Sequence, residues 1–134
     1  MRYLVLRALL IGLAIFVLSQ VIYYVLKISE HLSDGLGLFL FLLGPFAGSV
    51  LIAILAPRFK FTTGVFLSVP ASLLMGMCSI IAIELGLTPL KEYQGVNGAI
   101  FLALMNFPFV LGFCALGAAL GCIFSHKTAK KLLN

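Results

Sequence analysis

The chain has 134 residues, of which 63% are hydrophobic and 10% are charged, and its mean hydropathy is +1.22. A soluble domain of this length leaves a large share of its surface in water, so this composition excludes an ordinary soluble globular protein. The net charge is +5 at pH 7, and because the basic residues flank apolar stretches we expect them to meet lipid headgroups rather than nucleic acid.

Four apolar stretches predict four membrane-spanning helices, over residues 4–26, 36–56, 63–87 and 99–124. At about 1.5 Å per residue, each is long enough to cross a hydrocarbon core of about 30 Å. Lipid offers no partner for an unpaired backbone group, so each span must be helical. The sequence therefore predicts an all-α fold, a single integral membrane domain built as a four-helix transmembrane bundle.

Charged residues alternate between the two sides of these spans. One side, which holds both termini and the connection between the second and third spans, carries Arg2, Arg7, Arg58, Lys60, Lys127, Lys130 and Lys131. The other side carries only Lys27 and Lys91, together with all four acids. Because basic residues concentrate on the cytoplasmic side of a membrane, this pattern predicts cytoplasmic N- and C-termini. We expect a multi-pass protein of the plasma membrane, which is the inner membrane in a bacterium.

Several residues predict where the helices begin and end. Pro57 cannot continue a helix and predicts the end of the second span. Thr62 or Thr63 can cap the third span, and Asp34 and Asn97, each followed by glycine, can cap the second and fourth. The connection between the second and third spans is short, so these two helices should be antiparallel neighbours.

Prolines inside the spans predict local distortions and mark a faint repeat. Pro45, Pro70 and Pro108 each remove one backbone hydrogen bond and should kink their helices. A shift of the chain by 63 residues places Pro45 over Pro108 and Asp34 over Asn97. Two interpretations stay open: a duplicated helical hairpin around a site on a shared axis, or a chance likeness between apolar helices.

Small residues recur at helical spacing in every span, and such positions let helix backbones approach closely. They predict packing contacts, either within a compact bundle or with a partner. The candidate packing residues are Ala8, Gly12, Gly44, Gly48, Ser72, Gly76, Gly117 and Gly121.

Few polar side chains lie within the spans. Glu84 is the only acid there, about one turn from the end of the third span, and an acid in such a place is a candidate either for transport or for simple contact with headgroup water. Gln20 and Asn106 lie in the same half of the membrane as Glu84 and can form a polar cluster with it or join neighbouring helices.

The third span also carries serines along one stripe. These hydroxyls can line a hydrated path, or they can bond the carbonyl one turn back on a packing face. The serines that form the stripe are Ser68, Ser72 and Ser79. The three cysteines lie in apolar spans without a C-x-x-C motif, which is typical of small buried hydrophobic residues: Cys78, Cys114 and Cys122.

No nucleophile with its base, phosphate-binding loop or zinc motif is found in the sequence. We therefore expect no enzymatic activity, no cofactor and no metal. The first hypothesis is a non-enzymatic accessory, assembly or immunity-type subunit that docks on other membrane helices. The alternative is an oligomeric channel or transporter protomer for a small solute. The expected partners are the lipid bilayer and other membrane helices, including further copies of the chain, and not nucleic acid.

Overall fold

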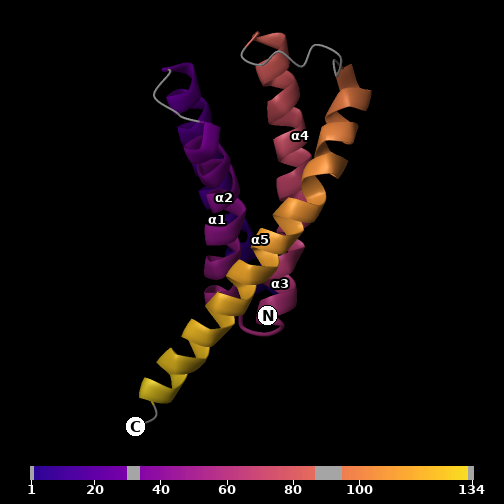
Figure 1. Cartoon of the computed structure of the whole chain (residues 1–134). Helices are drawn as coiled ribbons and strands as arrows, with labels where there is room; N and C mark the ends of the chain where they lie inside the picture. Colours follow the sequence, from indigo (N-terminus) through magenta and orange to yellow (C-terminus); the bar gives the residue numbers. More distant parts are fainter. Residues whose placement is uncertain (1, 30–33, 87–94, 133–134) are drawn as a thin grey trace.

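The computed structural model describes residues 2–29, 34–86 and 95–132, and all regular elements in these ranges are helices (Figure 1). The all-α prediction is thereby confirmed. In chain order the helices are α1 (Arg2–Ile28), α2 (Asp34–Leu55), α3 (Lys60–Phe66), α4 (Ser68–Glu84) and α5 (Gly95–Leu132).

Three stretches of the described chain are long and apolar enough to cross a membrane: Tyr3–Ile28, Lys60–Glu84 and Gly95–His126. The second of them contains both α3 and α4, which follow one another along one line. We call each such continuous helical stretch a rod, so the five helices form four rods. The remaining rod, α2, contributes a shorter apolar helix, Phe39–Leu55. Helices long and apolar enough to span a membrane are therefore present at the first, third and fourth predicted stretches.

Helix α2 packs against α1, α3 and α5, and α5 also packs against α3 and α4, so α2 and α5 together join the other helices. In Figure 1, α1 and α2 form one arm and α4 and the first half of α5 form another, and the two arms diverge towards the top. We call the lower end, which holds the N-terminus and the turn at residues 56–59, the proximal end. The opposite end, where α1 ends and α5 begins, is the distal end.

The third rod is interrupted at Leu67, between α3 and α4. Pro70 has no backbone N–H and so cannot bond the carbonyl of Phe66, one turn earlier. Just before this point, the N–H of Leu67 donates to the carbonyl of Gly64, three residues earlier, at 3.3 Å. The four-residue pattern of an α-helix returns at Ala71, whose N–H donates to the carbonyl of Leu67 at 3.0 Å. The distortion expected from Pro70 is present, whereas Pro45 and Pro108 lie inside α2 and α5 without dividing them.

Three of the predicted helix starts are wrong. α3 begins at Lys60, before Thr62 and Thr63, because Phe59 takes a left-handed conformation (φ 50°) from which the helix starts directly. The Thr63 hydroxyl donates to the carbonyl of Phe59 at 2.9 Å, a bond from within the helix and not a cap.

α5 likewise begins earlier than predicted, at Gly95, so Asn97 lies inside the helix. Gly95 has a positive φ of 85°, a conformation that glycine adopts without strain and that here precedes the helical turns. The predicted cap of the second span is wrong as well, because Asp34 is itself the first residue of α2. The predicted end of the second span before Pro57 is confirmed, since α2 ends at Leu55.

A single apolar cluster joins the rods in the middle of the bundle. We call it the core cluster, and it draws on α1, α2, α4, α5 and the break between α3 and α4: Phe16, Ile52, Leu67, Ala71, Met75, Val110 and Cys114. At the proximal end, the ammonium of Lys60 donates to the hydroxyl of Ser125, which ties the start of α3 to α5.

Glycines set how closely the rods approach. A methyl group on Gly48 would lie 2.7 Å from the carbonyl oxygen of Gly12, and one on Gly12 would lie 2.9 Å from the carbonyl oxygen of Gly48. The same holds where α5 meets α2: a methyl group on Gly121 would lie 2.5 Å from the carbonyl oxygen of Val50. Real side-chain carbons do not come this close to backbone atoms, so only glycine permits these helix separations.

Gly48→Ala should lower the free energy of unfolding by about 1–3 kcal/mol, because the new methyl group overpacks the contact of α1 with α2. Gly112→Ala is the matched control, since nothing lies within 4 Å of a methyl group there. It should leave stability unchanged or raise it by up to about 1 kcal/mol through helix propensity. Thermal unfolding of both variants in one detergent measures the difference, and equal stabilities would contradict the close approach.

Candidate functional site

Most serine hydroxyls of the bundle bond their own helix. Ser49 and Ser72 donate to the carbonyls three residues earlier at 2.8 and 3.0 Å, and Ser79 donates to Met75, four residues earlier, at 2.8 Å. Ser68 and Ser72 are buried, and Ser79 is half-buried. Two of the three serines on the predicted stripe, Ser72 and Ser79, therefore donate their hydroxyl hydrogen bonds to carbonyls of their own helix. Serines on helix-packing faces commonly do this.

Gln20 is the largest of the buried polar side chains that the structure describes, and 3% of its surface is exposed. Its Nε2 donates to the carbonyl of Phe41 at 3.1 Å and so links α1 to α2. Its Oε1 is buried and, among the residues that the structure describes, has no hydrogen-bond partner. A buried amide oxygen left unpaired costs free energy, so this atom marks the site most in need of a ligand.

Three polar residues lie one helical turn beyond the core cluster. Gln20 follows Phe16 by four residues on α1, Ser79 follows Met75 by four on α4, and Asn106 precedes Val110 by four on α5. α5 runs opposite to α1 and α4 (Figure 1), so each step of four residues leads towards the distal end on the same helix face. We call Gln20, Ser79 and Asn106 the distal polar layer.

The next turn of α1 brings Tyr24 against α4. Tyr24 and Cys78 line the same groove between the two helices, and the ring of Tyr24 contacts that of Tyr23 edge-on, with the centroids 5.1 Å apart. Tyr24 is not among the candidate residues predicted from the sequence. Its place beside the polar layer follows from helical spacing, four residues after Gln20.

Glu84 occupies a different environment from Gln20. It is the last residue of α4, exposed, and it lines a groove of about 500 Å³ between α4 and the start of α5. The structure thus places the only acid of the spans at a helix end, while it places Gln20 and Ser79 inside the bundle. The sequence predicts Glu84 about one turn further in, because the apolar stretch continues to Leu87, which lies outside the described residues.

The small residues singled out in the sequence lie at contacts between rods. Gly44 faces the Ser19 side chain, Gly76 faces Ala99 and Ala103, and Gly117 faces Ser49 and the carbonyl of Phe46. Ala8 is buried as well. Gly112 differs from these glycines because it is exposed and has nothing beside it.

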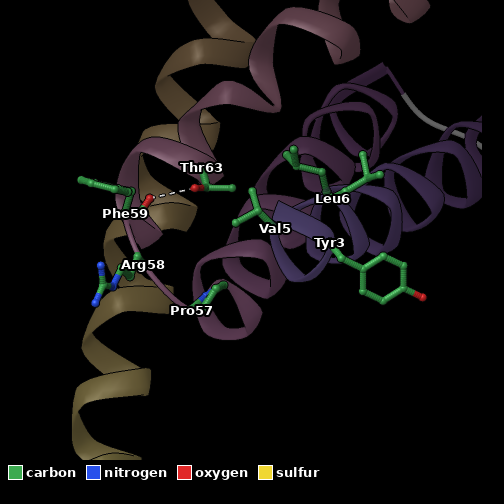
Figure 2. A pocket seen from close by; sticks show the side chains of 8 residues that line it. Tyr3, Val5, Leu6, Pro57, Arg58, Phe59 and Thr63 are labelled. Carbon is green, nitrogen blue, oxygen red and sulfur yellow. Dashed lines mark hydrogen bonds between the residues drawn. The ribbon is translucent and has the colours of Figure 1, made fainter. Parts of the chain in front are cut away.

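A second hollow, of about 630 Å³, lies at the proximal end between the first turns of α1 and the turn that joins α2 to α3. Figure 2 shows Val5 on the side of α1 that faces this turn, while the side chains of Arg58 and Phe59 point away from α1. The surface of this hollow is mostly hydrocarbon, from Val5, Leu6, Leu9 and Pro57. Tyr3, Arg58 and Thr63 add polar atoms to its lining.

Metal-binding groups do not gather in the described part of the chain: no three His, Cys, Asp or Glu side chains lie together there. The cysteines are free. Cys114 donates its S–H to the carbonyl of Pro45 at 3.6 Å across the contact of α5 with α2. His126 is exposed on α5, and His31 lies outside the described residues.

No protein-family model, curated protein or solved structure matches this chain.

Cys114 should react with a maleimide at least tenfold more slowly than Cys122 in the folded protein, because Cys114 has no exposed surface and Cys122 is half-buried. The two rates should converge once the protein is unfolded. Mass spectrometry of the labelled peptides in mild detergent and then in denaturant measures both. Rapid labelling of Cys114 in the native protein would show that the core cluster is open.

Proposed function

We propose that this chain is a non-enzymatic membrane subunit that acts through its outer surface, by docking on the helices of another membrane protein. The observation that supports this most directly is the filled interior. The core cluster occupies the middle of the bundle, and glycines hold α2 against α1 and α5 at backbone contact distance. A bundle packed in this way offers its surface, rather than a catalytic centre, for function.

In this proposal the chain crosses the membrane four times, with both termini in the cytoplasm. We count α2 as one of the four membrane-spanning helices, because it packs against α1, α3 and α5 and so lies at the same depth in the membrane as they do. Its 22 residues reach about 33 Å at 1.5 Å per residue, enough for the hydrocarbon core. The basic residues at the proximal end favour a cytoplasmic position for that end. The membrane in this proposal is the plasma membrane, which in a bacterium is the inner membrane.

The surface proposed for docking lies on α5. The glycines at contacts between rods have other helices of the same chain beside them, whereas nothing lies within 4 Å of a methyl group placed on Gly112. Pro108 and Ala119, at helical spacing on either side of Gly112, are exposed as well. We call these three residues the open face of α5. Small residues there allow a partner helix to approach α5 closely, as membrane helices do when they associate.

Gly112→Leu should reduce recovery of the partner at least fivefold in a gentle-detergent pull-down read by mass spectrometry, because the new side chain fills the open face. Ala14→Leu, on the exposed side of α1, is the control and should leave recovery unchanged. Both positions are exposed, so both variants should fold. Recovery of the wild-type protein alone, in a single closed form, would contradict the proposal.

A second candidate function is that of an oligomeric channel or transporter protomer for a small solute, with the distal polar layer and Glu84 along its route. The unpaired Oε1 of Gln20 favours it, because a transported solute able to donate a hydrogen bond would satisfy that atom.

If this second function holds, flux into proteoliposomes should fall at least twofold with Glu84→Gln, which removes the charge but keeps the shape. Glu84→Asp keeps the charge and should retain more of the flux. Absence of flux under every ion and solute gradient applied to the wild-type protein would rule this function out.

A further inference from the structure

The hollow at the proximal end lies between two parts of the chain that are far apart in the sequence. One wall is formed by the first turns of α1, from Tyr3 to Leu9, and the other by the turn at residues 57–59 together with Thr63 of α3 (Figure 2). Its volume is about 630 Å³. Because Tyr3 and Leu6 are exposed, the hollow lies on the outer surface of the bundle, which faces lipid in a membrane.

The lining of this hollow is polar at its proximal rim and hydrocarbon further in. Tyr3 and Arg58 belong to the rim, whereas the α1 wall continues to Leu9, about 9 Å further along the helix at 1.5 Å per residue. The hydroxyl of Thr63 already donates to the carbonyl of Phe59 at 2.9 Å, so it needs no other acceptor. A polar rim followed by hydrocarbon is the order in which a phospholipid presents its headgroup and its acyl chains to a membrane protein.

Arg58 is the charged residue of the lining, and no described acid lies near it. Asp34 begins α2 and Glu84 ends α4, both at the distal end. The side chain of Arg58 is exposed and points away from α1 (Figure 2), and such a long side chain can turn its guanidinium towards a headgroup while its stem stays on the turn. A guanidinium binds phosphate oxygens through paired hydrogen bonds, so the rim favours an anion.

We propose that this hollow binds one anionic phospholipid, with an acyl chain against the aliphatic residues of α1 and the phosphate beside Arg58. In a membrane, an anionic lipid combines the negative charge that the rim attracts with the hydrocarbon that the inner wall accepts. A lipid without net charge offers the same chain, but its headgroup cation is repelled by Arg58. The inference goes beyond the proposed docking function and does not depend on it, since it requires only that the proximal end lie at a headgroup layer.

Native mass spectrometry of the protein in detergent tests the role of charge. Dioleoylphosphatidylglycerol and dioleoylphosphatidylcholine, which have the same acyl chains and differ in headgroup charge, are added separately at equal concentrations. We expect at least fivefold more protein to carry one phosphatidylglycerol than one phosphatidylcholine. Arg58→Gln should reduce bound phosphatidylglycerol at least threefold, because it removes the cation of the rim.

Arg7→Gln is the matched control for this measurement. Arg7 is exposed on α1 near the same end but does not line the hollow, so its loss should leave bound phosphatidylglycerol nearly unchanged. Both arginines are exposed, and both variants should fold. Equal binding of the two lipids to the wild-type protein, or equal losses in the two variants, would overturn the proposal.

Val5→Phe tests the place of the acyl chain, because Val5 faces the turn and a phenyl ring there takes up part of the hollow (Figure 2). It should reduce bound phosphatidylglycerol at least threefold. Val17→Phe makes the same change in a separate hollow further along α1, lined only by aliphatic residues, and should leave binding unchanged. Leu6→Phe, at an exposed position of the α1 wall, serves if Val5→Phe does not fold. Unchanged binding in the variant of the proximal hollow, or an equal loss in Val17→Phe, would overturn the proposal.

Discussion

The contact of glycine with backbone between α1, α2 and α5 is the constraint on which the rest of this bundle depends. In lipid there is no hydrophobic force to drive helices together, so van der Waals contact and interhelical hydrogen bonds must do it. Gly12 and Gly48 each lie against the other's carbonyl oxygen, and Gly121 lies against that of Val50. α2 is held between its neighbours at distances that no larger residue permits. The core cluster and the polar layer both take their positions from this arrangement.

Close packing also explains why the polar side chains divide into two kinds. Where helices touch, a serine has room only to turn back on its own helix, as Ser49 and Ser72 do. Gln20 is longer and reaches across to α2, but the carbonyl of Phe41 engages only one end of its amide. The unpaired end is a consequence of geometry, since the apolar residues one turn away offer no donor. Among the buried side-chain nitrogen and oxygen atoms of residues 2–29, 34–86 and 95–132, the one without a partner therefore lies one turn from the apolar core.

The sequence was sufficient for the helical character of the chain and for three of its spans, because apolar stretches of membrane length have no other stable form in lipid. It was less informative about helix ends. The starts at Lys60 and Gly95 depend on left-handed conformations at Phe59 and at Gly95 itself, which leave no side-chain signature of the kind that Thr63 or Asn97 presents. The break at Leu67 could be foreseen from Pro70. The environment of Gln20 could not, because it depends on which faces of three separate helices meet.

The length of α5 has a mechanical consequence. Its 38 residues form one uninterrupted helix that extends about 57 Å, nearly twice the thickness of the hydrocarbon core. In Figure 1 its last turns run past the other helices, beyond the point where Lys60 holds Ser125. A sideways force on the projecting turns would therefore pass along α5, across its contact with α2, to its first half, which carries Asn106 and packs against α4.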